Sequence, residues 1–449
     1  MEMDRLATQR SMNKWAARAI PVILFGISGY ASYVVVERVC VRFFLRPPPD
    51  LGLVSQPPTM IGILVAFFIL MVLWIVPYVR IIQVIITDPG LVPRKEAVSL
   101  PSANSTNDAK NGSRTASRIQ SHDVNRALEG TGHPYAPDGV LDRRAILEGE
   151  VPPPPGLEKF YEKNIFVCDY TGLPIWCIEC RNWKPDRTHH SSELGRCVRR
   201  MDHYCPWVGG IVSETNMKFF VQFLVYAALC TGFIMSLLAY VVSVQRRSLP
   251  EIDPHVIVVL AIASLFFFFT AGLGGSTIHL ALLNLTTVDN LGRGNHIYFL
   301  AVRIDEDAQN FGASPSNANG GQGGSAHYTQ VTYPFQRLSI RGQDANNREN
   351  VESGAHAFAI LRTPSGDNPF YISRLRNMQE LMGYTILDWL LPFKYSPLCD
   401  HSSPESDFVM GPLVEQLKHD AGLSDRRSRS RHRKKRRRRR RDPNEDSIV

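Results

Sequence analysis

Four long apolar segments constrain the fold of this chain more than any other feature. They are nearly free of charge and cover Ala19–Val36, Thr59–Val79, Phe219–Val244 and Val256–Leu283. Each has roughly the 18–25 residues that a helix needs to cross a hydrocarbon core about 30 Å thick. The alternative, helices buried in a soluble core, would require a very large surrounding protein, because these segments are apolar on every face. We therefore predict an α-helical integral membrane protein with four transmembrane helices.

Four spans place both ends of the chain on the same side of a plasma membrane or endomembrane. The positive-inside rule favours the cytosol for these ends, because basic residues precede the first span and follow the fourth. Three arginines between residues 38 and 46 argue weakly for the opposite orientation. A cysteine-rich segment between spans two and three decides the question. Thiolate ligands and a reactive thiol persist best in a reducing compartment, so we expect this loop and both termini to be cytosolic.

The remaining segments differ in composition. Residues 99–132 and 312–326 are rich in Ser, Asn and Gly, which is typical of disordered linkers. The organisation predicted from the sequence is a cytosolic N-terminus (1–18), a linker (80–160), a cysteine-rich domain (175–220), a short segment after the fourth span (284–300), a low-complexity linker (301–366), an ordered aromatic element (367–393) and a disordered tail (394–449).

One set of cysteines and histidines has the spacing of a metal site. Cys177-x2-Cys180 is followed after nine residues by His190, and after six more by Cys197. A CxxC turn brings two thiolates to one ion, and a His and a third Cys complete a tetrahedral zinc shell. Four protein ligands make such a site structural, and the ion would contribute folding energy to a loop with little apolar core. The adjacent His189 leaves the choice of histidine open by spacing alone.

A second constellation predicts nucleophilic chemistry. Pro206 disfavours helical geometry at Cys205, so the segment should be extended there. Residues two apart in an extended segment share a face, which places His203 beside Cys205. His203 can then take the thiol proton, and Asp202 can orient the imidazole if a local turn brings it close. The alternative interpretation is a second metal half-site or an inert packed segment.

From Cys177 to Phe220 the chain resembles the DHHC family of protein S-acyltransferases, or palmitoyltransferases. The matching residues are the CxxC pair, Lys184–Arg187, His190, Cys197, the DHYCPW run of residues 202–207, Asn216 and Phe219. Three further motifs resemble the family's DPG turn (Asp88, Pro89, Gly90), its TTxE motif with Asp for Glu (Thr286, Thr287, Asp289), and its C-terminal PaCCT element, which includes Asn377. Some fungal members of the family also have a DHYC core, and the chain looks like one of them.

The resemblance also identifies departures from the family pattern. Family members have two zinc sites, and the first falls on the Cys/His set above, with His190 as the histidine. The positions of the second are occupied by Ser191, Leu194, Tyr204 and Ile211, none of which is a zinc ligand of that site. The resemblance therefore implies one structural zinc ion, and it makes His203 the catalytic histidine. We expect Leu194, Tyr204 and Ile211 to pack together where the second metal would lie.

The reaction that the resemblance implies has two steps. Cys205 attacks the thioester of palmitoyl-CoA, and a cysteine of a membrane-associated protein substrate then takes the acyl group from the acyl-enzyme. The alternative is a zinc-stabilised membrane scaffold without catalytic activity, which the missing second zinc site and Asp289 would favour. The intact set of Asp202, His203 and Cys205 argues for the enzyme.

The C-terminal basic run is a separate feature. Thirteen of the 50 Lys and Arg residues lie within Arg426–Arg441, so the positive excess belongs to this tail. A solvated tail is one interpretation, and attraction to anionic lipids of the cytosolic leaflet is the other. Nucleic-acid binding is not expected, because the run has no interleaved aromatic residues for base stacking. Cys40, Cys168, Cys230 and Cys399 lie outside all of these motifs.

Overall fold

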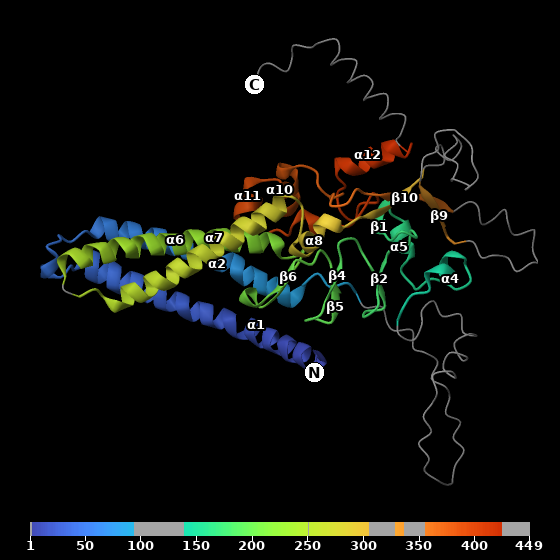
Figure 1. Cartoon of the computed structure of the whole chain (residues 1–449). Helices are drawn as coiled ribbons and strands as arrows, with labels where there is room; N and C mark the ends of the chain where they lie inside the picture. The colour runs from blue at the N-terminus through green and yellow to red at the C-terminus, as the bar shows by residue number, and fades with distance from the viewer. Residues whose placement is uncertain (1, 94–138, 250, 305–327, 336–354, 424–449) are drawn as a thin grey trace, which may run out of the picture. The chain divides into compact units, whose positions relative to one another are not determined.

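The computed structural model describes residues 2–93, 139–249, 251–304, 328–335 and 355–423, which form two compact units. The first unit contains long helices that run beside one another (Figure 1). They are α1 (Glu2–Tyr33), which continues as the π-helix η1 (Val34–Leu45), α2 (Pro57–Thr87), α6 (Met217–Ser248) and α7 (Pro254–Leu282). Among the described residues, four helices are long and apolar enough to cross a membrane, as the hydropathy predicts.

The first helix is much longer than its predicted span. The apolar pattern predicts a span over 19–36, whereas the span candidate in the structure covers Thr8–Leu45, and helix α1 begins at Glu2. The segment predicted as a cytosolic N-terminus, residues 1–18, is therefore helical from Glu2 onward. The reason is that residues 2–18 contain neither Gly nor Pro and are rich in Ala, Met, Arg and other strong helix formers. Hydropathy locates the apolar part of a helix and not its ends.

Short hairpins and helices complete the first unit. Hairpin β4–β5 pairs His189–Ser191 with Arg196–Val198, and hairpin β6–β7 pairs His203–Cys205 with Gly210–Val212. The short helices of this unit are η2 (Pro49–Leu51), η3 (Pro206–Val208), α8 (Thr287–Leu291), α10 (Arg374–Met382), α11 (Ile386–Leu390) and η7 (Pro397–Cys399). The 3-10 turn η4 (Arg293–Asn295) follows α8 in the chain.

The second unit is built on an antiparallel sheet in the order β1-β8-β10-β9. Its strands are β1 (Ile165–Cys168), β8 (Phe299–Arg303), β10 (His356–Arg362) and β9 (Thr329–Tyr333). The other elements of this unit are α4 (Arg143–Leu147), α5 (Glu158–Tyr161), α12 (Pro412–Asp420) and the hairpin of β2 (Ile175–Cys177) with β3 (Asn182–Lys184). Apolar side chains cover both faces of the sheet, with Tyr161 and Phe358 in one layer and Leu300 and Val414 in the other.

This sheet differs from the organisation predicted for the polar segments. Strands β9 and β10 lie within the predicted linker 301–366, α4 and α5 lie within the predicted linker 80–160, and α12 lies within the predicted disordered tail. Strand β10 buries five consecutive residues by pairing with β8, which is more than fifty residues earlier in the chain. Such a short strand between polar segments has no distinctive local pattern. Residues 94–138, 305–327, 336–354 and the basic run 426–441 lie outside the described residues.

Candidate active site

Cys205 is the last residue of strand β6, in the hairpin β6–β7. Opposite it lies Gly210, where a Cβ atom would approach Ile85 Cγ2 to 2.6 Å, so the hairpin can pack against α2 only with glycine here. Pro206 begins the 3-10 turn η3, and Gly209 ends it in the left-handed conformation, with φ of 83°. The extended geometry predicted at Cys205 is therefore present, and the side chains of His203 and Cys205 interact.

Asp202 completes the set from the position immediately before β6. Its Oδ2 atom lies 2.6 Å from His203 Nδ1, so the two side chains meet although they are adjacent in sequence. Helix α8 holds the same carboxylate, because the Thr287 backbone N–H donates to Oδ1 and the Thr287 hydroxyl donates to Oδ2, both at 2.9 Å. Asp202 is 4% exposed. The structure thus brings together the three residues that the sequence singled out.

The protonation of this set follows from its contacts. Burial opposes a charge on His203, but the hydrogen bonds to Asp202 and Cys205 outweigh it and raise the pKa of His203 to about 10. Burial likewise opposes the charge on Asp202, yet its bonds to His203 and Thr287 hold the pKa of this carboxyl below its usual value. At neutral pH the site therefore holds an imidazolium between a carboxylate and a sulfur atom.

The DPG turn lies directly beside hairpin β6–β7. The Thr215 hydroxyl donates to the carbonyl oxygen of Asp88 at 2.8 Å, and the Ser213 hydroxyl donates to that of Pro89 at 3.1 Å. Gly90 has a φ of +74°, and a Cβ atom here would lie 3.1 Å from Ser213 Oγ. These contacts explain why the turn ends in glycine, and they tie the end of α2 to the segment that follows Cys205.

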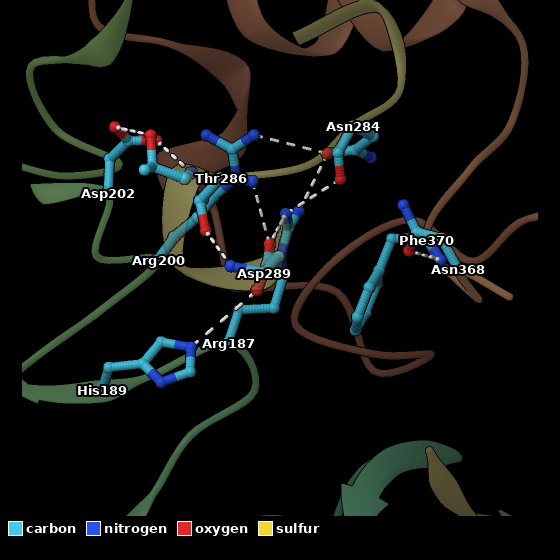
Figure 2. Close-up of polar contacts among 10 residues, drawn as sticks. Arg187, His189, Arg200, Asp202, Asn284, Thr286, Asp289, Asn368 and Phe370 are labelled. Carbon is cyan, nitrogen blue, oxygen red and sulfur yellow. Dashed lines mark hydrogen bonds and ion pairs between the residues drawn. The ribbon is translucent and has the colours of Figure 1, made fainter. Parts of the chain in front are cut away.

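Helix α8 is fixed by a buried charge cluster, which Figure 2 shows. Thr286 and Asp289 form a capping box, in which each side chain accepts a hydrogen bond from the backbone N–H of the other. Arg187 Nη2 donates to Asp289 Oδ2 at 2.5 Å, and Arg187 also donates to the side chain and carbonyl oxygen of Asn284. Burial opposes the charge on Asp289, but Arg187 and the hydrogen bonds hold its pKa far below the usual range.

Hydrogen bonds from three side chains position the C-terminal part of the first unit. Asn377, in the predicted PaCCT-like element, donates to the carbonyl oxygen of Leu282 at 2.9 Å and is 2% exposed. Gln222 donates to the Trp389 carbonyl oxygen, and the Tyr226 hydroxyl donates to that of Leu390. The sequence analysis did not single out Gln222 or Tyr226. The sequence contains a signal that could have identified them, because a polar side chain within a predicted span usually has a specific partner.

An apolar cavity of about 110 Å³ opens beside Cys205. Side chains of α1, α2, α6 and α7 line it together with Trp207, and Tyr78 fixes this turn by donating to the Trp207 carbonyl oxygen at 2.8 Å. Residues along its walls include Leu24, Trp74, Phe223, Cys230, Ala263 and Phe266. The sequence analysis could not name these residues, because four separate helices contribute them.

The predicted metal ligands form a cluster. One ligand atom from each of Cys177, Cys180, His190 and Cys197 lies within 4.8 Å of the others. Three sulfur atoms and one imidazole nitrogen at this separation fit a tetrahedral zinc ion. The structure places His190 in this set, whereas Nε2 of His189 lies 3.8 Å from Asp289 Oδ1.

Three of the four positions that the resemblance gives to a second zinc site line a cavity of about 190 Å³. Leu194, Tyr204 and Ile211 line it, so they share one site but leave it partly open, unlike the close packing that we expected. The hairpin is held from its other side by Asn216, whose side chain accepts from the Ser213 N–H and donates to the Ile211 carbonyl oxygen. Hydrogen bonds therefore support the part of the hairpin where family members have metal ligands.

Comparison with known proteins identifies the family. The family profile of the DHHC palmitoyltransferases matches residues 172–294. Palmitoyltransferase pfa5 of Aspergillus fumigatus is 36% identical over 94% of this chain and 93% of its own length. Palmitoyltransferase pfa5 of Emericella nidulans is 37% identical over 93% of this chain and 88% of its own length, and palmitoyltransferase PFA5 of Saccharomyces cerevisiae is 27% identical over 56% and 60%. The chain therefore belongs to the DHHC palmitoyltransferase family.

Proposed function

We propose that this protein S-palmitoyltransferase works through a thioester on Cys205. The single observation that carries the proposal is the position of this cysteine: its side chain contacts His203 on one side and lines the apolar cavity on the other. A nucleophile paired with an oriented base is the arrangement that covalent acyl transfer requires. The cavity adds a place for a long acyl chain beside the reacting sulfur.

The reaction takes place in two thioester exchanges. His203 accepts the thiol proton, and the Cys205 thiolate attacks the carbonyl carbon of palmitoyl-CoA. The bond from that carbon to the CoA sulfur breaks, and the sulfur leaves with the proton from His203. In the second exchange a cysteine of a membrane-associated protein gives its proton to His203 and attacks the acyl-enzyme, which releases Cys205. Thioester exchange is nearly balanced in energy, so the site mainly supplies a thiolate, a base and proximity.

The membrane orientation follows from the reaction. The Cys-rich domain, which lies between α2 and α6 in the chain, and both termini are cytosolic, where CoA and reduced thiols are found. The cavity between the long helices holds the acyl chain. The Arg-rich tail is attracted to anionic lipids of the same leaflet. As a fungal-type member with a DHYC core, the chain retains the histidine that contacts the nucleophile.

A zinc ion held by Cys177, Cys180, His190 and Cys197 supports the fold. Four protein ligands close the coordination shell, so the ion would supply structural stability and no open position for substrate. The donor types and their separation support this assignment. One ion per chain is proposed, because three of the second set of positions are Leu194, Tyr204 and Ile211, which line a cavity and do not match the Cys and His ligands of a zinc site.

Labelling of the purified protein with palmitoyl-CoA tests the route. We expect hydroxylamine-labile label on the wild type and none on Cys205→Ser. Cys230→Ser is the matched control, because Cys230 lines the same cavity away from the histidine and should not be needed. Equal labelling of Cys205→Ser and wild type would exclude the proposed intermediate, and it would revive the alternative of a scaffold whose other cysteines are acylated.

A further inference from the structure

Cys205 lies where hairpin β6–β7 meets the long helices of the first unit. It ends strand β6, and the 3-10 turn η3 follows it directly. Cys205 and Trp207, the middle residue of this turn, both line the apolar cavity between those helices. An acyl chain held in the cavity would meet the sulfur atom only if η3 stays in place against the helices. The contacts that hold this turn therefore bear directly on acyl transfer.

The turn has little stability of its own. It contains three residues, and the backbone hydrogen bond that closes it is long, at 3.3 Å from the Gly209 nitrogen to the Pro206 carbonyl oxygen. Pro206 has no N–H group to donate, and 3-10 turns have poorer hydrogen-bond geometry than α-helices. Contacts from outside the turn must therefore fix its position.

Tyr78 on α2 provides such a contact. Its hydroxyl group donates to the Trp207 carbonyl oxygen at 2.8 Å, and the residue is 0% exposed. The last carbonyl groups of a helical turn have no partner within it, so that of Trp207 needs a donor from elsewhere. A hydrogen bond that is shielded from water is also electrostatically stronger than an exposed one. One bond thus ties the turn that follows Cys205 to a membrane-length helix.

The ring of Tyr78 is held by three helices. Its centroid lies 5.7 Å from that of Phe25 on α1, 5.9 Å from that of Trp74 on α2 and 5.0 Å from that of Phe223 on α6. Side chains in such a closely packed environment interdigitate and keep one orientation on average. The hydroxyl group of Tyr78 therefore points in a fixed direction, where the Trp207 carbonyl oxygen meets it.

The other contacts of the turn are less directional. The Trp207 ring packs against Phe266 and Phe269 of α7, with centroids 6.1 and 5.2 Å away. Apolar ring contacts tolerate small displacements better than a hydrogen bond, which weakens steeply as its angle changes. Tyr78 is also close enough to Cys205 for their side chains to interact electrostatically. Tyr78 is not one of the described residues that line the cavity, so it can act on the turn without touching an acyl chain.

We propose that Tyr78 is a positioning residue for acyl transfer: its hydroxyl group fixes η3 and so holds the Cys205 sulfur atom in place beside an acyl chain in the cavity. The inference rests on the proposed thioester route and adds a residue of α2 that takes no part in proton transfer. Position matters because the sulfur atom must lie within about 3–3.5 Å of the thioester carbon before it can attack. A small displacement of η3 would remove that geometry, while His203 and Cys205 would still share one face of β6.

Removal of the hydroxyl group alone tests the inference. Tyr78→Phe keeps the ring and its packing, and we expect about tenfold slower acylation of Cys205 at saturating palmitoyl-CoA. The half-saturating concentration should change little, because the wall of the cavity is unchanged. Both quantities are measured by single-turnover labelling over a range of palmitoyl-CoA concentrations. A normal rate in Tyr78→Phe would overturn the inference.

A second reagent separates the position of the sulfur atom from its reactivity. Iodoacetamide alkylates the Cys205 thiolate and has no acyl chain, so its reaction does not depend on the cavity. The rate and pH profile of alkylation, read at the Cys205 peptide, should be the same in Tyr78→Phe as in wild type, because Asp202 and His203 are untouched. If alkylation slowed as much as acylation, Tyr78 would act on the thiolate itself, and the inference would be overturned.

Tyr226→Phe is the matched control. The Tyr226 hydroxyl group also donates to a backbone carbonyl oxygen at 2.8 Å, that of Leu390, from a membrane-length helix. Its loss should leave acylation within about twofold of wild type. Equal losses of rate in Tyr78→Phe and Tyr226→Phe would mean that any such bond to the long helices affects the rate, and this would overturn the inference.

Gly209→Ala displaces the same turn from its other end and carries the test if Tyr78→Phe does not fold. Gly209 has a φ of 83°, and a Cβ atom here would lie 3.2 Å from the Ala17 carbonyl oxygen. We expect slow acylation together with normal alkylation by iodoacetamide in this variant too. Normal acylation in Gly209→Ala would overturn the inference.

Failure of this inference is distinguishable from failure of the proposed function. Wild type and Cys205→Ser are labelled first, and equal labelling of the two defeats the thioester route itself. If the wild type is labelled at Cys205 and Tyr78→Phe matches it, only the positioning role fails. Zinc content and melting temperature are measured on every variant. A slower rate in Tyr78→Phe that comes with loss of zinc would reflect unfolding and would overturn the inference.

Discussion

Nδ1 of His203 lies 2.6 Å from Oδ2 of Asp202, although the two residues are neighbours in the chain. The contact is possible because Asp202 precedes strand β6, where its N–H donates to the Val212 carbonyl oxygen and its side chain turns toward α8. Adjacent residues within a regular strand would point to opposite faces. The pair leaves the other imidazole nitrogen available to Cys205, so one short segment brings together the residues proposed as nucleophile, base and orienting carboxylate.

The first prediction concerns pH. The pKa of His203 is raised from 6.5 to about 10, partly by Asp202, so the imidazolium persists until the pH rises through about 10. Asp202→Asn should lower this pKa toward 6.5 and move the loss of the imidazolium to lower pH. The rate of alkylation of Cys205 by iodoacetamide, followed from pH 6 to 11, reports the change. An unchanged profile in Asp202→Asn would contradict the assignment of the carboxylate.

The same shift has a consequence for stability with a defined sign. Because the pKa of His203 is higher in the folded than in the unfolded chain, this residue stabilises the fold fully below about pH 6.5, and the contribution is lost as the pH rises to about 10. Melting temperatures of wild type should therefore fall over this range more than those of His203→Gln. Parallel curves for the two proteins would contradict the prediction.

The second prediction concerns the length of the acyl chain. Ala263 on α7 lines the cavity and is 4% exposed, whereas Ala261 on the same helix is exposed. Ala263→Phe should fill the part of the cavity that it lines and shift the preference from palmitoyl-CoA to shorter donors. Each excluded methylene group is worth about 1–3 kcal/mol of discrimination. The measurement is labelling of Cys205 by donors of graded length.

Ala261→Phe is the control for this change. It adds the same side chain on the exposed face of α7, so the preference for palmitoyl-CoA should remain that of the wild type. If the two variants changed the chain-length profile equally, the cavity would not be the acyl site.

The third prediction is the metal content. Purified protein should contain one zinc ion per chain, and Cys197→Ser should lose it and melt at lower temperature, because zinc binding contributes folding energy. Cys168→Ser, a change of the same kind at a buried cysteine of the second unit, should retain the ion. Two zinc ions per chain would disprove the proposal that Tyr204 and its neighbours occupy a position without metal.

The fourth prediction concerns Tyr204, the tyrosine of the DHYC motif. Tyr204 pairs with Ile211 across the hairpin and lines the cavity of about 190 Å³, while His203 and Cys205 share the opposite face. Tyr204→Phe and Tyr204→His should therefore both acylate Cys205 within about twofold of wild type. If Tyr204→His acylated Cys205 ten times faster than wild type, the second histidine of the DHHC motif would take part in the chemistry.

The active-site residues illustrate what can be derived from spacing. The pair His203 and Cys205 could be found because a strand places residues two apart on one face, and Pro206 signals that extended geometry. The CxxC pair was recognisable for a similar reason, since a short turn determines the distance between its sulfur atoms. The roles of Arg187 and Asn284 were not accessible in this way, because their partners lie about a hundred residues apart in the chain.

By itself, the sequence determined the four membrane-length helices, the Cys/His set and the Asp202-His203-x-Cys205 segment, because each depends on composition or spacing within one stretch of chain. Only the tertiary structure decided which helices line the cavity and that Thr287 holds Asp202 through hydrogen bonds. It also assembled a sheet from strands that begin at residues 165, 299, 329 and 356. Contacts of this kind depend on which distant segments pack together, and the pattern of residues within one segment does not determine its packing partner.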